Sequence, residues 1–457
     1  MINFIKNNYK TIIKYLLIYL LVFISYQYLI TSLKFGDSTT LFAFSHALRH
    51  GQVIYKDFNT IITPLYAVIM SLGLYIYDSY ITFVIEQSIL VTILIYFLNK
   101  ILDKKIYLFL SIFLLFYPKF NSIFYMSYNF LTLIFITILY YLEKNYQDKD
   151  YLIGFIVGLI ILSKHTIGGM ILIPLLIICF KNKKKLLKRI VGVAIPCILF
   201  LVYLLINNNL FEFINLCILG LFDFEDGNSH YSGIWFYLSI IIFVISIIFI
   251  IKNKNLKYNY YILVTFFFSY PLFDLYHFSL FLYFFLLMIF VYYKDYHKKY
   301  FYYLGIFLIL ILLIFYIYYA STFNFNYKNI IFKYYDTLIY PGNQNVDYGI
   351  QKKLLDKYCS KKDKCIIFDF LGTMYNTSRD YGLDYYSASL VGNTGYNGTQ
   401  TLIDKINKRN NVYLIFSKSE IENNDLYNQC NYKLFNYIKN NYKLIEEKYD
   451  IYIYYKK

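Results

Sequence analysis

The sequence predicts an all-α polytopic membrane domain followed by a small α/β domain. Hydrophobic residues make up 59% of the 457 residues and charged residues only 16%, whereas soluble domains are about 45–50% apolar and about 25% charged. Runs of about 20 mainly apolar residues, the length that crosses a bilayer as a helix, recur before Ala320. No such run follows it. We therefore divide the chain into a transmembrane domain over 1–320 and a second domain over 321–457.

About eleven membrane-spanning helices are expected in the first domain. A short basic start precedes the first one and no small-residue cleavage site follows it, so we expect a retained helix rather than a removed signal peptide. The predicted spans are 11–33, 80–98, 106–124, 129–143, 151–167, 169–180, 190–207, 234–251, 260–276, 278–293 and 301–320.

Lys and Arg residues gather in alternate loops between these spans, and the loop at 181–189, KNKKKLLKR, is the most basic. Cytoplasmic loops carry such an excess. The pattern therefore predicts a multi-pass protein of the inner or plasma membrane with a cytoplasmic N-terminus. An odd number of spans then places the C-terminal domain outside the cytoplasm. Because the net charge of +16 is explained by these loops, we expect membrane lipids and no nucleic acid among the partners.

The polar stretch over 34–79 is predicted to be an outer loop that contains helices of its own. An amphipathic segment begins near Asp37, and the sequence GQVIYKDFNTIITP follows at 51–64. The apolar segment 65–77 would reach only ~20 Å as a helix, which is less than the ~30 Å of the hydrocarbon core. We therefore expect it to be a re-entrant or interfacial helix on the outer side.

The second domain shows the short, mixed elements of an α/β fold. Apolar runs at 364–370 (KCIIFDF) and 411–417 (NVYLIFS) predict buried strands. The segments 399–411 and 426–441 fit amphipathic helices, and 442–457 fits a closing pair of strands.

Cysteine and acidic residues give weaker signals. Cys359, Cys365 and Cys430 lie in the predicted outer domain, where an oxidising compartment would allow one disulfide whose pairing the sequence leaves open. No Cys or Cys/His spacing typical of a metal site occurs, so no residue is assigned as a metal ligand. The acidic loop 206–233 could hold a divalent cation through oxygen ligands. A solvated outer loop explains the same composition and is favoured, so a divalent cation remains open as a cofactor.

Asp37 is the leading candidate for a catalytic residue. It stands shortly after the first predicted span, where a carboxylate can approach both lipid headgroups and water. The competing interpretation is an N-cap for the helix that follows, a role worth about 1 kcal/mol that the sequence GDSTT suits well.

The order of motifs in the outer loop resembles the first outer loop of polytopic glycosyltransferases of the GT-C superfamily, which includes lipid A aminoarabinose transferases and protein mannosyltransferases. The resemblance rests on Asp37 after the first span, GQVIYKDF at 51–58, Pro64 and the short helix after it. It implies a GT-C-like fold with outer juxtamembrane helices, and it makes Asp37 the general base. It also implies substrate-binding roles for Lys56 and Asp57, although Asp57 could instead fix the turn before Pro64.

Two motifs at the predicted outer ends of spans fit the same resemblance. At 127–129, SYN has Asn129 where several relatives place an Asp, and Asn can orient a ligand but cannot act as a base. At 163–168, SKHTIG resembles a Ser/Thr-Lys-x-x-x-Gly element, which implies substrate-binding roles for Lys164 and His165. A Lys at the edge of hydrocarbon is costly unless it pairs or extends to the interface. The alternative for Lys164 is therefore a snorkelling anchor.

The segment YPLFDLYH at 270–277 resembles a third element of the family, with Leu272 in place of the usual Arg. Asp274 and His277 would share a helical face at i,i+3. The resemblance implies that both bind substrate, and the alternative is a hydrogen-bonded pair at a helix end.

Together these residues predict an enzyme that transfers a sugar from a polyprenyl-phosphate-linked donor to a lipid, glycan or protein acceptor. Direct displacement with one carboxylate base would invert the anomeric centre. A transporter or flippase is the main rival, but it should show internal repeats and interrupted helices near the midplane. A non-catalytic surface protein is the other rival, and it leaves the ordered loop motifs unexplained.

Overall fold

The structure is a computed structural model of the chain. It describes residues 2–30, 37–103, 126–223, 233–253, 256–296, 348–359, 365–368, 371–372, 375, 385–386, 394–422 and 432–457. The predicted domain boundary at 320 and the predicted spans 106–124 and 301–320 lie outside these residues.

The chain forms two compact units, each assembled from separate stretches of sequence. The first unit takes residues 1–31, 84–199 and 230–331, and the second takes 32–83, 200–229 and 332–457. The outer-loop segment and the C-terminal domain thus belong to the same unit.

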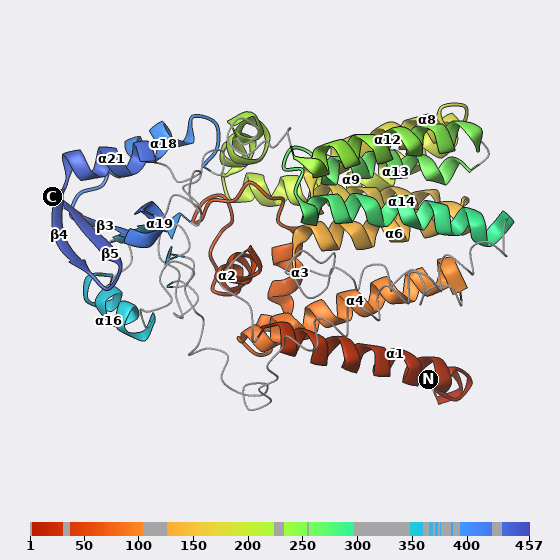
Figure 1. The fold of residues 1–457 in the computed structure, drawn as a ribbon, viewed down its shortest axis with the longest axis horizontal. Helices are drawn as coiled ribbons and strands as arrows, with labels where there is room; N and C mark the ends of the chain where they lie inside the picture. Colours follow the sequence, from red (N-terminus) through yellow and green to blue (C-terminus); the bar gives the residue numbers. More distant parts are fainter. Residues whose placement is uncertain are drawn as a thin grey trace. The chain divides into compact units, whose positions relative to one another are not determined.

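The first unit is helical throughout its described residues. Its helices are α1 (Ile2–Ile30), α4 (Tyr80–Leu102), α6 (Tyr128–Asn145), α7 (Asp150–Ser163), α8 (His165–Cys179), α9 (Lys183–Ile206), α12 (Ile234–Lys252), η3 (Lys257–Asn259), α13 (Tyr260–Val264), η4 (Thr265–Phe268) and α14 (Leu275–Tyr296). The helices α12, α13 and α14 contact one another, and Figure 1 shows them running alongside one another.

Four of the described helices are long and apolar enough to cross a membrane, namely α4, α9, α12 and α14. They match four predicted spans, but the structure does not support eleven. The predicted spans at 151–167 and 169–180 are the helices α7 and α8, of 14 and 15 residues, which reach only about 21–23 Å each. The predicted span at 260–276 is divided into a short α-helix, a 3₁₀ turn and a loop. Apolar composition alone did not reveal these interruptions.

The helices α7 and α8 form a tight hairpin. A Cβ atom added to Gly168 would lie 2.3 Å from the Cα atom of Ile161, so only glycine permits this approach of the two backbones. Ser163 donates from Oγ to the Tyr128 carbonyl and lies 2.8 Å from Thr132 Oγ1. The end of α7 is thereby fixed against the start of α6.

A fully buried Arg189 joins three helices at the other end of α7. It donates from Nε to Asp150 Oδ1 at 2.9 Å and from Nη2 to Glu143 Oε2 at 3.0 Å. Tyr261 adds a 2.8 Å hydrogen bond to Glu143. A buried charge is tolerated only when it is paired and hydrogen-bonded, and both acids satisfy that need. The basic segment 181–189 therefore contributes a structural brace as well as a positively charged surface.

The second unit contains a five-stranded mixed sheet of order β2-β1-β3-β5-β4. Its strands are β1 (Cys365–Phe368), β2 (Tyr385–Tyr386), β3 (Val412–Ser417), β4 (Lys443–Lys448) and β5 (Ile451–Lys456). β1 pairs in parallel with β2 and β3, whereas β5 is antiparallel to β3 and β4. The predicted strands and the closing strand pair are thus confirmed.

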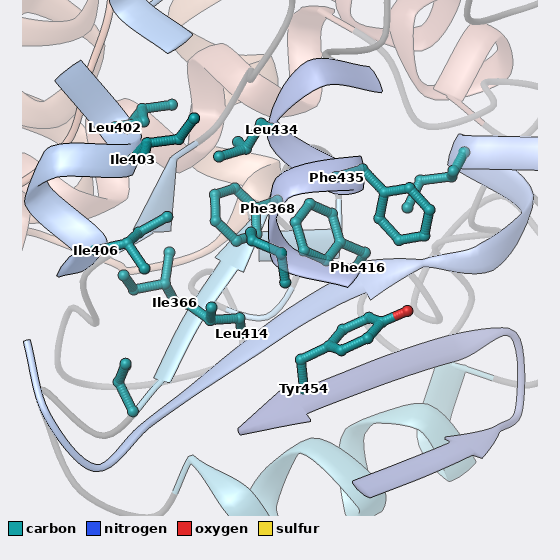
Figure 2. Close-up of a cluster of buried hydrophobic side chains, with 13 residues drawn as sticks. Ile366, Phe368, Leu402, Ile403, Ile406, Leu414, Phe416, Leu434, Phe435 and Tyr454 are labelled. Carbon is teal, nitrogen blue, oxygen red and sulfur yellow. The ribbon is translucent and has the colours of Figure 1, made fainter. Parts of the chain in front are cut away.

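Alternate residues of a strand point to opposite sides of a sheet, and both faces of this sheet are apolar. Helices cover each face. The rings of Phe368 and Phe416 stack with their centres 4.3 Å apart on the face covered by α18 (Gly398–Asn407) and α21 (Tyr432–Asn441). Figure 2 shows both rings within the cluster of buried side chains on this face. The opposite face packs against α16 (Tyr348–Tyr358). The predicted α/β character of this domain is confirmed.

The outer-loop segment forms two helices, α2 (Asp37–Arg49) and α3 (Leu65–Leu74). The ten residues of α3 reach about 15 Å, so it is too short to span a bilayer. The segment after α9 consists of α10 (Leu210–Phe213) and the π-helical η2 (Ile214–Leu219). It contacts the loop between α2 and α3. Asn209 donates to the Ile54 carbonyl at 2.7 Å, which ties the two stretches together.

Candidate functional site

Lys164 lies at the break between α7 and α8, in extended backbone with φ −148° and ψ 99°. Its ammonium donates to Asn129 Oδ1 at 2.8 Å. It also lies 5.3 Å from the centre of the Phe268 ring and 5.8 Å from that of Tyr128. Two aromatic faces and one amide therefore surround the Lys164 amino group at the end of the bundle where α6 and α8 begin.

Asp274 and His277 form the second part of this arrangement, at the start of α14. The Asp274 carboxylate accepts from the His277 backbone N–H at 2.8 Å and lies 2.9 Å from its ring Nδ1. It also interacts electrostatically with the Lys164 ammonium. Because Asp274 orients the ring through Nδ1, Nε2 is the nitrogen left for a ligand.

A hydrogen bond between Ser127 and Tyr276, which lie next to these residues in the sequence, also joins α6 to α14. The Tyr276 hydroxyl lies 2.6 Å from Ser127 Oγ, which connects the start of α14 to the residue that caps α6. We call Asn129, Lys164, Asp274 and His277 the bundle-end cluster. Four predicted residues from three distant stretches of the sequence are thus brought together. The arrangement offers a cation, an imidazole and an orienting carboxylate, a set suited to binding a phosphate or sugar hydroxyls.

His165 and Asp37 are placed by the backbone. His165 is the first residue of α8 and is partly buried. Asp37 is the first residue of α2, and its side chain lies outside the part of the chain that the structure describes. Both interpretations of Asp37, general base and helix cap, therefore remain predictions.

Asp57 fixes a turn in the second unit. Its Oδ2 atom accepts from the Val53 backbone N–H at 2.6 Å. Tyr55 within this turn has a positive φ of 69° and donates from its hydroxyl to the Ile62 carbonyl at 2.8 Å. The turn-fixing interpretation of Asp57 thus has a specific contact behind it.

Lys56 and Asp57 also line a cleft of about 330 Å³ within the second unit. The other lining residues come from the same loop, from 212–216 and from the α18 region: Tyr55, Phe58, Asn59, Glu212, Asn215, Leu216, Thr394, Thr401, Leu402, Lys405, Lys408 and Arg409. Four basic side chains against two acidic ones favour an anionic ligand. We call this the basic cleft.

The cleft-lining residues of α18 and of the chain just after it were not predicted from the sequence. The pattern of segment 399–411 predicts only an amphipathic helix. Lys405, Lys408 and Arg409 are spaced at i, i+3 and i+4, which places them on one side of a helical turn. This spacing was the available signal, but a solvated helix face gives the same pattern.

The pairing of cysteines is resolved for two of the three candidates. Cys359, just after α16, is bonded to Cys365 at the start of β1, with Cα atoms 5.4 Å apart. Cys430 lies outside the described residues. A disulfide is typical of proteins outside the reducing cytosol.

Comparison of this chain with protein-family models, with curated proteins and with solved structures gives no match.

Proposed function

We propose that this protein is a membrane glycosyltransferase that takes a sugar from a polyprenyl-phosphate-linked donor. The bundle-end cluster carries the proposal, because it holds Lys164 beside an Asp–His pair at the start of α14, a helix long and apolar enough to cross a membrane. A lipid phosphate places its charge at such an end while its tail lies among the helices. The motif order of the outer loop supports the same class of enzyme through its resemblance to the GT-C superfamily.

In the proposed reaction, an acceptor hydroxyl or amine attacks the anomeric carbon while the bond from that carbon to the phosphate oxygen breaks. The acceptor proton passes to Asp37 as general base, and the lipid phosphate leaves with the bonding electron pair. Lys164 and His277 stabilise the negative charge that develops on this phosphate, which is often the largest catalytic contribution. A single displacement inverts the anomeric configuration.

The remaining candidates bind and orient the substrates. Asn129 accepts a hydrogen bond from Lys164, and Asp274 orients the imidazole ring of His277 through Nδ1. In the second unit, Lys56 contributes positive charge to the basic cleft, which would accept a negatively charged part of the donor or acceptor. Asp57 shapes the loop that carries Lys56, and His165 lies next to the phosphate-binding lysine. We place the reaction at the outer face of the cytoplasmic membrane.

Binding of a long-chain polyprenyl monophosphate to the purified full-length protein in detergent tests this proposal. Lys164→Gln should weaken binding at least tenfold, because it removes the cation aimed at the phosphate. The matched control is Lys100→Gln, which changes a lysine near the end of α4 and should bind like the wild type. Equal affinities for the wild type and Lys164→Gln would exclude Lys164 as the phosphate ligand.

A comparison of cells with and without the protein separates the enzyme from a transporter. The enzyme predicts that one surface glycan loses a sugar when the protein is absent. An unchanged glycan profile together with loss of uptake of a solute would instead establish transport.

A further inference from the structure

We propose that His46, His50 and Asp78 form a binding site for a divalent transition-metal ion, with Zn²⁺ as the ion that fits best. The two histidines lie four residues apart on α2 and so share one face of the helix. Asp78 follows α3 in the same unit. One ligand atom from each residue lies within 4.8 Å of the others.

The two distances from the imidazoles to the carboxylate are close to those of a metal site. His46 Nε2 lies 3.5 Å from Asp78 Oδ2, and His50 Nε2 lies 2.7 Å from the same oxygen. Tetrahedral Zn²⁺ with bonds of about 2.0–2.1 Å holds its ligand atoms roughly 3.3 Å apart. The first pair already has this separation. The second pair shares a hydrogen bond, and a metal ion replacing that proton would widen it by about 0.6 Å.

Contacts around the three residues hold them in place. Arg49 donates from Nε to the Leu74 carbonyl at 3.2 Å, and its guanidinium lies 4.7 Å from the centre of the Tyr75 ring. These contacts fasten the end of α3 to α2, just before Asp78. On the other side, the Phe42 ring packs 4.9 Å from that of Tyr80. The site is therefore organised by packing before any ion binds, which reduces the entropy that binding costs.

The exposure of the three side chains suits an ion that must enter from solvent. The side chains of His46, His50 and Asp78 are 9%, 14% and 28% exposed. The two imidazoles are therefore largely buried, whereas Asp78 is exposed and its carboxylate is reachable from solvent. Three protein ligands also leave a fourth position of a tetrahedral ion open for water or another ligand.

The chemistry of the ligands selects the class of ion. Ca²⁺ and Mg²⁺ prefer sites built from oxygen atoms, whereas two imidazoles and one carboxylate suit Zn²⁺ and its first-row neighbours. The sequence did not predict this site, because the third ligand stands 28 residues after the second. A bound ion would connect α2 to Asp78, which follows α3, and would so stabilise the outer-loop segment. This inference does not depend on the proposed glycosyltransferase activity.

The test is the metal content and Zn²⁺ affinity of the full-length protein, purified in detergent without a histidine tag. After EDTA treatment and titration with Zn²⁺, the wild type should bind about one equivalent tightly. His46→Ala/His50→Ala should lose this equivalent, and Asp78→Asn should weaken binding at least tenfold. The control His165→Gln, which alters a histidine on α8, should keep it.

A second measurement covers the case in which the double variant does not fold. With Co²⁺ as the probe, His50→Cys should add a thiolate-to-metal charge-transfer band that the wild type lacks. Absence of this band would overturn the proposal. Wild-type Zn²⁺ content no higher than that of the double variant would also overturn it. Equal affinity of the wild type and Asp78→Asn would mean that the helix histidines alone chelate the ion, and would remove Asp78 from the site.

Discussion

Lys164 and Asn129 are joined by a 2.8 Å hydrogen bond from Nζ to Oδ1, although 35 residues separate them. The bond connects the break between α7 and α8 with the first turn of α6. It fixes the position of the Lys164 amino group in the bundle-end cluster, which under the proposed function is the group that binds the phosphate.

Asn129→Leu should therefore weaken binding of polyprenyl monophosphate. Hydrogen bonds to charged groups contribute about 1.5–3 kcal/mol, so we expect a loss of roughly tenfold or more in affinity. Titration of the purified variant measures this change. The adjacent Tyr128 contributes its ring and its carbonyl, so Tyr128→Phe is the matched control and should bind nearly as well as the wild type. Unchanged affinity in Asn129→Leu would show that Lys164 does not need this partner.

Arg189→Ala should strongly destabilise the first unit. The substitution leaves Glu143 buried without its cation and Asp150 with only the longer, 3.9 Å ion pair to Lys185. Breaking a buried ion pair costs about 3–5 kcal/mol. Thermal unfolding in detergent should show a clearly lower midpoint. Lys184→Ala changes an exposed lysine in the same helix and should stay within about 0.5 kcal/mol of the wild type. A variant at Arg189 that unfolds like the wild type would contradict the role of the brace.

Cys217 should resist alkylation in the folded protein. Burial raises the pKa of its thiol from 9.0 to about 12, and its Sγ atom contacts the Thr60 carbonyl at 3.6 Å. Because the thiolate is the reactive form, modification at pH 8 should be far slower than in denatured protein. The folded thiol keeps its proton where the unfolded one loses it, so this group's contribution to stability is complete below pH 9 and declines between pH 9 and about 12. Mass spectrometry after iodoacetamide treatment measures the rate, and equal rates in both states would contradict the packing of η2.

The Cys359–Cys365 disulfide tests on which side of the membrane the second unit lies. Protein made in cells and digested without reduction should contain the two cysteines in one cross-linked product. Closing so short a loop should stabilise the domain by about 2 kcal/mol, so Cys359→Ser should unfold at a lower temperature. Recovery of both cysteines as free thiols from cells would place this domain in the reducing cytoplasm and reverse the proposed orientation.

Local patterns in the sequence predicted the C-terminal domain well. The strands β1 and β3 are short runs of apolar residues bounded by polar ones, and α18 and α21 have one apolar face each. The strand pair β4–β5 follows from alternation around Tyr449 and Asp450, which both have a positive φ and form the turn. These signals need only neighbouring residues.

The membrane part was predicted less well, because apolar composition does not show where a helix stops. The hairpin of α7 and α8 depends on the close approach of Gly168 to Ile161, which involves contacts across the turn. The groups of the bundle-end cluster were predicted one by one, but their contacts were not, since Asn129 and Lys164 meet only after folding. The His46–His50–Asp78 group was missed for the same reason.

Sugar transfer by the Asp37→Asn variant tests the central proposal most directly. The assay incubates purified protein with radiolabelled polyprenyl-phosphate sugars and a membrane extract that supplies the acceptor. The account predicts that the wild type transfers label from one of these donors, and that Asp37→Asn binds polyprenyl monophosphate normally but transfers none. Transfer by Asp37→Asn at the wild-type rate would contradict the assignment of Asp37 as the general base.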